Sequence, residues 1–225
     1  MKTDILSSLI FLSILSVTSI YKASSQTPAH TLLIETNKGK MKCILYEQTP
    51  MHADNFIQLV NDGTYNGVLF HRVIKDFMIQ TGDPDSKNAA KGALVGSGGP
   101  AYRVPAEFHP DLYHKTGALA AARQGDQANP NRESNGSQFY IVQGEVFSDE
   151  QLDQMEISGS HIKFTAEQRM LYKTLGGTPH LDYGYTVFGE VTEGIEVIDA
   201  IAAEPTDERD RPLEDVKIIK ITLLK

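Results

Sequence analysis

The chain has 225 residues, of which 40% are hydrophobic and 22% charged, and its formal net charge is −8 at pH 7. This length and composition predict a soluble globular protein with one good-sized domain, or at most two small ones. The acidic charge argues against a general nucleic-acid binder, because such proteins need Lys and Arg to neutralise phosphates. The single cysteine, Cys43, excludes an intrachain disulfide and a cysteine-based zinc cluster.

The N-terminus differs from the rest of the chain. Residues 5–20, ILSSLIFLSILSVTSI, carry no charge, and their length suits the core of a signal peptide but is short for a membrane span. Small residues at 23–25 fit a signal-peptidase site, so we expect residues 1–25 to be a signal peptide that is cleaved after its last residue. Because Asp4 weakens the basic region, an uncleaved N-terminal anchor is the alternative. We expect a periplasmic or secreted protein with no other membrane contact.

The folded domain is expected at residues 31–225, after a short linker at 26–30. Within it, a helix is predicted at about 50–61, because Thr49 can cap it, Pro50 suits its first position and Gly63 suits its end. A second helix is predicted over 193–203, where apolar residues recur at helical spacing and acidic residues come early.

Eight segments are predicted to be strands, because each is a run of β-branched, aromatic or alternating apolar residues bounded by turn residues. They are residues 31–36, 40–46, 68–74, 77–83, 117–123, 137–143, 185–191 and 215–224. The strands do not alternate with helices as βαβ units would, which favours an antiparallel sheet. The simplest such fold is mainly β: a closed eight-stranded antiparallel barrel whose ends are covered by the two helices.

Residues 144–178 do not fit this plan, because they look helical. Residues 165–168, Thr-Ala-Glu-Gln, have the form of a capping box, and Gly176 and Gly177 would end the helix. About 35 residues could hardly hold a core alone. We therefore expect a helical insertion at about 144–178 within the domain rather than a separate domain.

The stretch FHRVIKDFMIQTGD at residues 70–83 carries the first hint of chemistry. It places Arg72 and Gln80 among Phe, Val, Ile and Met residues. The run is either a strand with one solvent-exposed face or the wall of an apolar groove with two placed hydrogen-bonding groups. Met78 and Gln80 are two residues apart and therefore share a face of a strand, whereas His71 is expected to point to the side opposite Arg72, in a structural role.

This stretch, together with NGSQFYIV at 135–142 and LDYGYTVFGEV at 181–191, resembles the three signature blocks of the cyclophilins, the peptidyl-prolyl cis–trans isomerases. The similarity covers about residues 31–224, apart from the helical insertion. It implies an eight-stranded antiparallel barrel capped by two helices. It also implies an enzyme that isomerises X–Pro bonds in proline-containing segments of folding proteins, here exported ones, and we expect it to be monomeric.

By motif position, the resemblance implies that Arg72 and Gln80 are catalytic. The positions that it implies for substrate binding are Phe77, Met78, Ala121, Ala122, Arg123, Gln138, Tyr140, His180, Leu181 and Tyr185. The small-residue strand is expected to line the groove largely with its backbone. No cofactor is required for this reaction, and no metal site is expected, because the seven histidines form no HxH or HExxH pattern.

The physics of the reaction agrees with these residue types. An X–Pro bond isomerises slowly because amide resonance is lost in the twisted state. Only groups that bind the twisted amide better than the planar one accelerate the reaction. The guanidinium of Arg72 can donate to the lone pair that the prolyl nitrogen regains, while Phe77, Met78 and Leu181 can form a dry proline pocket. Gln80 can hold either Arg72 or a substrate carbonyl.

Three positions depart from the family pattern. His180 stands where many members have Trp, Tyr185 replaces the groove histidine, and Ala121 replaces a frequent Met. Activity is expected to survive, because the arginine and the proline pocket remain, but the cyclic peptide cyclosporin, which uses the Trp wall in the family, should bind weakly. These departures and the insertion keep a second hypothesis open, a peptide-binding chaperone module that uses the same groove with little turnover.

Overall fold

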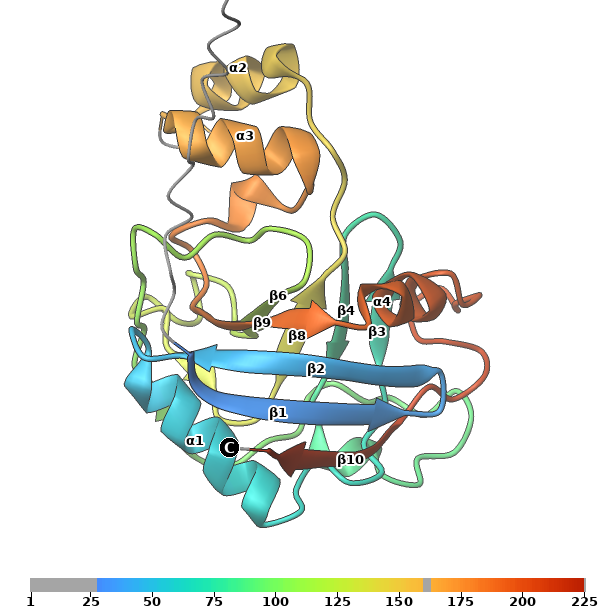
Figure 1. Ribbon diagram of the computed structural model, residues 1–225. Coiled ribbons are helices and arrows are strands. Elements are labelled where there is room, and N and C mark those ends of the chain that lie inside the picture. The colour runs from blue at the N-terminus through green and yellow to red at the C-terminus, as the bar shows by residue number, and fades with distance from the viewer. Residues whose placement is uncertain (1–27, 160–162, 225) are drawn as a thin grey trace, which may run out of the picture.

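The computed structural model describes residues 28–159 and 163–224 (Figure 1). The expected signal peptide at residues 1–25 and the start of the expected linker lie outside the described residues. Within the described part of the chain, no helix is both long and apolar enough to cross a bilayer.

The centre of the fold is one antiparallel sheet of eight strands in the order β10-β1-β2-β9-β6-β8-β4-β3, which curves into a half-barrel (Figure 1). Its strands are β1 (Pro28–Thr36), β2 (Gly39–Tyr46), β3 (Arg72–Ile74), β4 (Met78–Thr81), β6 (Ala118–Ala121), β8 (Phe139–Val142), β9 (Val187–Glu193) and β10 (Ile218–Leu223). Two short strands, β5 (Arg103–Val104) and β7 (Ser134–Asn135), form a separate pair. The mainly β, antiparallel prediction is therefore confirmed.

The prediction of a closed barrel is not confirmed. The predicted strand at 68–74 is regular only in the three residues of β3, and within the described residues no ladder joins β3 to β10. Instead, the chain before β3 contacts the other edge through a single bridge, Leu69 with Lys217, and a few backbone hydrogen bonds. The N–H groups of Gly67 and Phe70 donate to the carbonyls of Ile218 and Val216, each at 2.8 Å. These bonds satisfy the backbone without the continuous pairing of a closed ladder.

The main core fills the concave side of the sheet and is covered by α1 (Pro50–Asn61) and α4 (Ile195–Ala202). Phe56 of α1 lies at its centre, with ring centroids 5.0 Å from Tyr65, 5.1 Å from Phe139 and 5.4 Å from Phe188. Each such buried ring contributes about 2–3 kcal/mol of transfer free energy. The helix thereby holds strands β8 and β9 in place behind the candidate site.

The bounds predicted for α1 are confirmed, but its predicted cap is wrong. The hydroxyl of Thr49 makes no capping hydrogen bond. The Glu107 carboxylate replaces it and accepts hydrogen bonds from the backbone N–H groups of Met51 at 3.1 Å and His52 at 2.9 Å. A distant acidic side chain thus serves the first turn of the helix, where the macrodipole favours negative charge. Local sequence alone does not reveal such a partner.

Two further helices, α2 (Asp149–Ser158) and α3 (Ala166–Thr174), occupy the predicted helical segment and lie together at the end of the molecule away from α1 (Figure 1). The capping box predicted at residues 165–168 is present, and Ser148 begins α2 with a second one. The pair has its own small apolar cluster, formed by Tyr113, Phe147, Leu152, Phe164 and Tyr172. Four helices are therefore described, two on the main core and two outside it.

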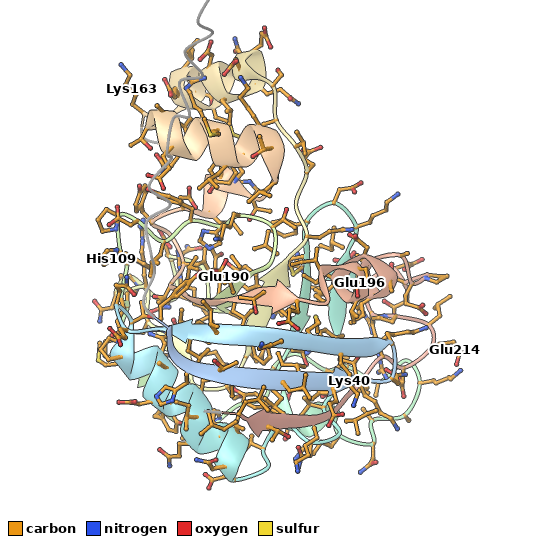
Figure 2. The ribbon with its side chains drawn as sticks, in the orientation of Figure 1. Lys40, His109, Lys163, Glu190, Glu196 and Glu214 are labelled. Atoms are coloured by element: carbon orange, nitrogen blue, oxygen red, sulfur yellow. The ribbon has the colours of Figure 1, made fainter. Side chains whose placement is uncertain are left out.

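The outer surface is charged, with exposed side chains such as Lys40, Glu196 and Glu214 around the sheet and α4 (Figure 2). Cys43, in contrast, is completely buried in β2, and this burial raises the pKa of its thiol. A thiol that stays protonated is a poor nucleophile. Cys43 is therefore a core residue.

Candidate active site

The candidate site begins with the hairpin of β3 and β4. In this hairpin Arg72 lies directly opposite Gln80, and Ile74 lies opposite Met78. The next strand, β8, pairs Gln80 with Tyr140. Because directly opposed residues share a face of the sheet, Arg72, Gln80 and Tyr140 form one row across three strands.

These residues line a pocket of about 100 Å³ on the face of the sheet opposite the main core. The lining consists of Arg72, Phe77, Met78, Gln80, Ala122, Arg123, Tyr140, Leu181 and Tyr185. The volume is of the order of the roughly 150 Å³ cavity that takes up benzene in another protein, so a five-membered ring is a suitable occupant. Nine of the twelve predicted site residues are thus brought together.

Arg72 stands at the edge of this pocket with 43% of its side chain exposed. Its Nε atom lies 3.6 Å from Oδ2 of Asp210, which is equally exposed. An exposed pair of this kind contributes little stability, about 0–1 kcal/mol. Within the described residues, the terminal guanidinium nitrogens form no hydrogen bond, so they remain able to donate to a bound molecule.

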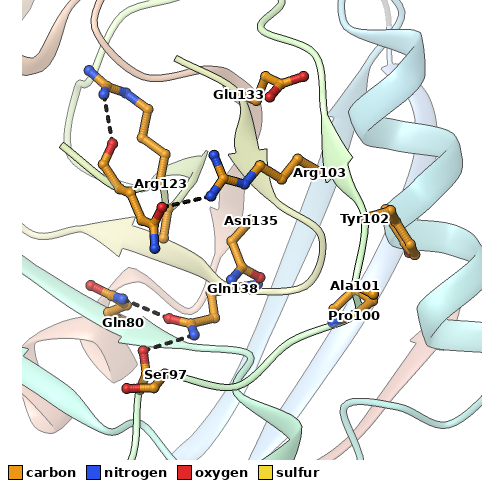
Figure 3. A pocket seen from close by; sticks show the side chains of 13 residues that line it. Gln80, Ser97, Pro100, Ala101, Tyr102, Arg103, Arg123, Glu133, Asn135 and Gln138 are labelled. Carbon is orange, nitrogen blue, oxygen red and sulfur yellow. Dashed lines mark hydrogen bonds between the residues drawn. The ribbon is translucent and has the colours of Figure 1, made fainter. Parts of the chain in front are cut away.

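Gln80 does not hydrogen-bond Arg72 in this structure. Its Nε2 instead donates to Oε1 of the buried Gln138 at 3.1 Å. Gln138 in turn donates from Nε2 to the carbonyls of Gly96 at 3.0 Å and Gly98 at 2.7 Å. These bonds fix the two amides in one orientation and attach the loop at 96–98 to the sheet (Figure 3).

Beyond these amides lies a second, larger pocket of about 460 Å³, shown in Figure 3. It shares Gln80, Ala122 and Arg123 with the first pocket, and most of its other lining side chains are polar. Its other lining residues include Tyr102, Arg103, Gln124, Glu133 and Asn135. The two pockets together form a continuous groove whose narrow end is apolar.

The wall opposite Arg72 comes from the chain after α3. A short 3₁₀ turn, η2 (Pro179–Leu181), carries His180 and Leu181. The ring of His180 stacks on Phe77, with centroids 5.7 Å apart and an interplanar angle of 21°. This stack sits at the rim, where His180 is exposed, whereas Leu181 lines the pocket.

Tyr185 and Arg123 complete this wall as a pair. The guanidinium carbon of Arg123 lies 4.5 Å from the centroid of the Tyr185 ring, in a cation–π contact. Its Nε donates to the carbonyl of Gly184 at 2.7 Å, and one terminal nitrogen is 2.7 Å from Oδ1 of Asp126. Arg123 therefore holds the end of the wall and is itself charge-compensated.

The structure separates three predicted residues from the apolar pocket. Gln138 lies in the larger pocket, and His180 lies at the rim. The side chain of Ala121 points into the main core, because β6 places alternate residues on opposite faces and Ala120 and Ala122 take the groove side. A side-chain contact of Ala121 with substrate is therefore not expected.

His71 immediately precedes β3 and does not line the apolar pocket. It is buried, and neither ring nitrogen has a hydrogen-bond partner among the residues that the structure describes. Burial lowers the pKa of His71, although the nearby Asp83 carboxylate opposes this shift. A neutral ring packed beside Gly96 supports the loop that Gln138 holds.

Several residues of the groove could not be found from the sequence. Tyr102 and Arg103, which begins the short strand β5, and Glu133 come from two segments that no pattern in the sequence marks as strand or helix. The buried His114, whose Nε2 is 3.0 Å from the Tyr140 hydroxyl, had no motif to mark it. No group of three metal-ligating side chains occurs within the described residues.

Comparison with known proteins agrees with this geometry. The family described as cyclophilin type peptidyl-prolyl cis-trans isomerase/CLD matches residues 31–223. A relative from Staphylococcus saprophyticus, named as a peptidyl-prolyl cis-trans isomerase, is 36% identical over 195 residues, which cover 86% of this chain and 91% of the relative.

Solved structures give the same assignment. A cyclophilin-type isomerase from Cryptosporidium parvum superimposes with a TM-score of 0.63 and 27% identity, over 87% of this chain and 98% of that one. Its structure in the presence of the dipeptide Ala-Pro gives a TM-score of 0.62 and 25% identity, over 87% and 99% of the two chains. The fold, the groove and the sequence match thus coincide, and the chain belongs to the cyclophilin-type peptidyl-prolyl cis–trans isomerases.

Proposed function

We propose that the groove binds a proline-containing segment with the proline ring in the apolar pocket, and that Arg72 accelerates rotation about the X–Pro bond. The observation that carries this proposal is the position of Arg72. Its guanidinium stands at the edge of a pocket walled by Phe77, Met78 and Leu181, directly across the hairpin from Gln80.

The chemistry follows from amide resonance. Rotation about a peptide bond meets a barrier of about 18–20 kcal/mol, because the partial double bond must be broken. In the twisted state the prolyl nitrogen regains a lone pair, which the planar amide does not offer. A donor aimed at this lone pair stabilises the twisted state more than the ground state, and only such a difference raises the rate. Arg72 is suitable because its guanidinium is always charged.

Gln80 has a supporting role in this proposal. One of its two amide hydrogens is used in the bond to Gln138. The other hydrogen and the carbonyl oxygen can bond the backbone of the bound peptide beside the proline. Since Gln138 fixes the orientation of the amide, little rotational freedom is lost when the peptide binds.

The substrate class follows from the pocket and from the family. A pocket of about 100 Å³ between aromatic and aliphatic walls excludes large side chains but suits a proline ring. The Cryptosporidium protein was studied in the presence of Ala-Pro, which makes Ala-Pro peptides suitable first probes for this chain. We infer that flexible proline-containing segments of folding proteins are its substrates.

The test is the cis-to-trans rate of an Ala-Pro peptide with residues 26–225 and with the Arg72→Ala and Arg72→Lys variants. We expect Arg72→Ala to lower kcat/KM about 10²- to 10³-fold, the usual effect of removing one preorganised donor. Arg72→Lys should recover part of the rate, because it keeps the charge but loses the rigid head. Arg209→Ala, which removes an exposed arginine from the loop beside Asp210, is the matched control and should change little.

The same experiment separates catalysis from simple holding of peptides. If the Arg72→Ala variant accelerates isomerisation as much as the natural chain does, the role proposed for Arg72 is contradicted. If the natural chain binds the peptide but gives no acceleration, the groove acts as a chaperone module. A rate that requires Arg72 establishes the enzyme mechanism.

We also propose that the enzyme acts on exported proteins, in the periplasm or outside the cell. The support is the uncharged run at residues 5–20 followed by small residues at 23–25. The intact mass of the protein recovered from its producing cell tests this proposal. A mature chain that begins near residue 26 is expected, whereas a full-length chain in the cytoplasmic fraction would contradict it.

A further inference from the structure

A buried chain of hydrogen bonds runs from the floor of the proline pocket to helix α3. The Tyr140 hydroxyl is 3.0 Å from Nε2 of His114, and Nδ1 of His114 is 2.9 Å from Oδ1 of Asp182. The other carboxylate oxygen of Asp182 accepts a hydrogen bond of 2.6 Å from the hydroxyl of Tyr172, in α3. The side chains of His114 and Asp182 are 0% exposed.

The directions of these bonds follow from the groups involved. Burial is the main cause that raises the pKa of both tyrosines, so each hydroxyl keeps its proton and can donate it. The Asp182 carboxylate accepts from Tyr172, from Nδ1–H of His114 and from the backbone N–H of His114 at 2.8 Å. When Nε2 of His114 carries no proton, it accepts the hydrogen bond from the Tyr140 hydroxyl. Each side chain of this hydrogen-bond network therefore has a partner. An unpaired polar group would be costly in such buried, low-dielectric surroundings.

The segment next to Asp182 is held by α3 a second time. Gln168, which is only 1% exposed, donates from Nε2 to the hydroxyl of Tyr183 at 3.1 Å. Tyr183 has a φ of +59°, a conformation that costs a residue with a side chain about 1–2 kcal/mol and so needs support from its surroundings. At the start of the segment, the N–H of Thr178 donates to the carbonyl of His114 at 2.8 Å.

This doubly held segment, residues 178–185, carries one whole wall of the groove. His180 and Leu181 precede Asp182, and Tyr185 follows Tyr183 by two residues. Any shift of Asp182 or Tyr183 would therefore move the residues that face Phe77 and Met78. The hydrophobic cluster around Tyr172 in turn fixes α3 against α2. The helical pair thus lies outside the sheet but is connected rigidly to the pocket.

We propose that Tyr172 and Gln168 are positioning residues, through which α3 sets the wall of the proline pocket and hence the affinity for the peptide. This inference rests on the proposed function of the groove. Neither residue lines the pocket, so each acts through Asp182, His114 and Tyr140 or through Tyr183. The alternative is that the network only stabilises the fold, in which case affinity would not depend on it.

The decisive variant is Tyr172→Phe, which keeps the ring in its cluster and removes only the hydroxyl. We expect KM for the Ala-Pro peptide to rise about three- to tenfold, as for one lost hydrogen bond to a charged group, with kcat within about twofold. Tyr113→Phe is the matched control, because Tyr113 belongs to the same cluster but its hydroxyl makes no hydrogen bond within the described residues. Tyr183→Phe, at a less buried position, should shift KM in the same direction as Tyr172→Phe.

A double-variant cycle tests whether the chain acts as one unit. Tyr140→Phe and Tyr172→Phe remove the two ends of the same network, so their combined effect on KM should be smaller than the product of the single effects. An unfolding measurement of every variant separates affinity from stability. The proposal is overturned if Tyr172→Phe and Tyr183→Phe lower the stability but leave KM unchanged. It is also overturned if the effects of Tyr140→Phe and Tyr172→Phe on KM simply multiply in the double variant. Arg72→Ala, measured in parallel, reports separately on the function of the groove.

Discussion

Gln80 and Gln138 are joined by a direct amide–amide hydrogen bond of 3.1 Å, and this bond lies on the boundary between the two pockets of the groove. Gln138 is buried and uses its amide hydrogens on the carbonyls of Gly96 and Gly98. One side chain therefore orients a candidate catalytic amide and anchors the loop that borders the larger pocket. This arrangement makes Gln138 a sensitive position although it does not face the proline pocket.

Replacing Gln138 with leucine keeps its volume but removes all of these bonds. The Gly96 carbonyl and the Gln80 amide lose their partner, and the Gly98 carbonyl keeps only the long bond of 3.5 Å from Asn135, so we expect a loss of about 1–3 kcal/mol in the free energy of unfolding. We also expect kcat/KM to fall about tenfold, because Gln80 is no longer oriented. The checks are a urea titration and the Ala-Pro assay, with Gln58→Leu on the exposed side of α1 as control. An active Gln138→Leu enzyme would show that Gln80 needs no orientation.

The stack of His180 on Phe77 gives a second prediction, for the cyclic peptide cyclosporin. Because a histidine replaces the tryptophan of many family members, the apolar rim is smaller and the natural chain should bind the peptide weakly. His180→Trp should increase the affinity at least about tenfold, because a larger ring on Phe77 buries more apolar surface. Calorimetric titration of both proteins measures the change, and tight binding by the natural chain would contradict the prediction.

The third prediction concerns Glu107 and pH. Burial would raise the pKa of this carboxyl, but hydrogen bonds from the His52 side chain and from the backbone N–H groups of His52 and Met51 outweigh it, so the net shift is downward from 4.5. A lowered pKa in the folded state means that the stabilisation is complete above about pH 4.5 and is lost as pH falls through the folded-state value.

Glu107→Gln should therefore lower the free energy of unfolding at pH 7 by about 1–2 kcal/mol, the effect of a lost helix cap. The deficit should shrink as pH falls from 4.5 through the lower folded-state pKa of Glu107, because the carboxyl of the natural chain becomes protonated over that range and its charge no longer contributes. Thermal unfolding at pH 7 and at pH 3 checks both parts. Glu214→Gln, at an exposed ion pair with Lys91, is the control and should have little effect at either pH. A deficit that is the same at both pH values would show that charge is not the cause.

The sequence predicted the parts of this molecule that depend on neighbours in the chain. Strand alternation placed Met78 and Gln80 on one face, and turn residues located α1 and the capping box at residues 165–168. The family resemblance, rather than local pattern, placed Ala121 in the groove, and its side chain faces the main core because alternate residues of β6 point to opposite faces of the sheet.

Features that depend on distant loops could not be predicted in this way. Glu107 caps a helix whose first turn lies more than fifty residues earlier. His114 contacts Asp182 only because the chain after α3 runs back to the sheet. The edges of the half-barrel are joined by irregular backbone bonds around Leu69, which no periodic pattern marks. Long-range polar contacts of single residues leave no repeating signal in the sequence.

The last prediction concerns the base of the helical pair, where two glycines meet. Gly144 has a φ of +67°, and a Cβ atom there would overlap the backbone of Gly177. Gly159, at the end of α2, has almost the same φ of +72° but nothing within 4 Å of its Cβ position. Alanine at either site suffers the same backbone strain of about 1–2 kcal/mol, so the difference between the two variants isolates the steric clash.

We expect Gly144→Ala to be less stable than Gly159→Ala by about 2 kcal/mol or more, because two backbones must move apart. Because Gly177 leads into residues 178–185, the movement should also reach the wall of the pocket, and KM for the Ala-Pro peptide should rise only in Gly144→Ala. Urea unfolding and the isomerase assay on both variants give the two numbers. Equal stabilities would show that the two segments separate freely, and α2 and α3 would then have no rigid base from which to position the groove.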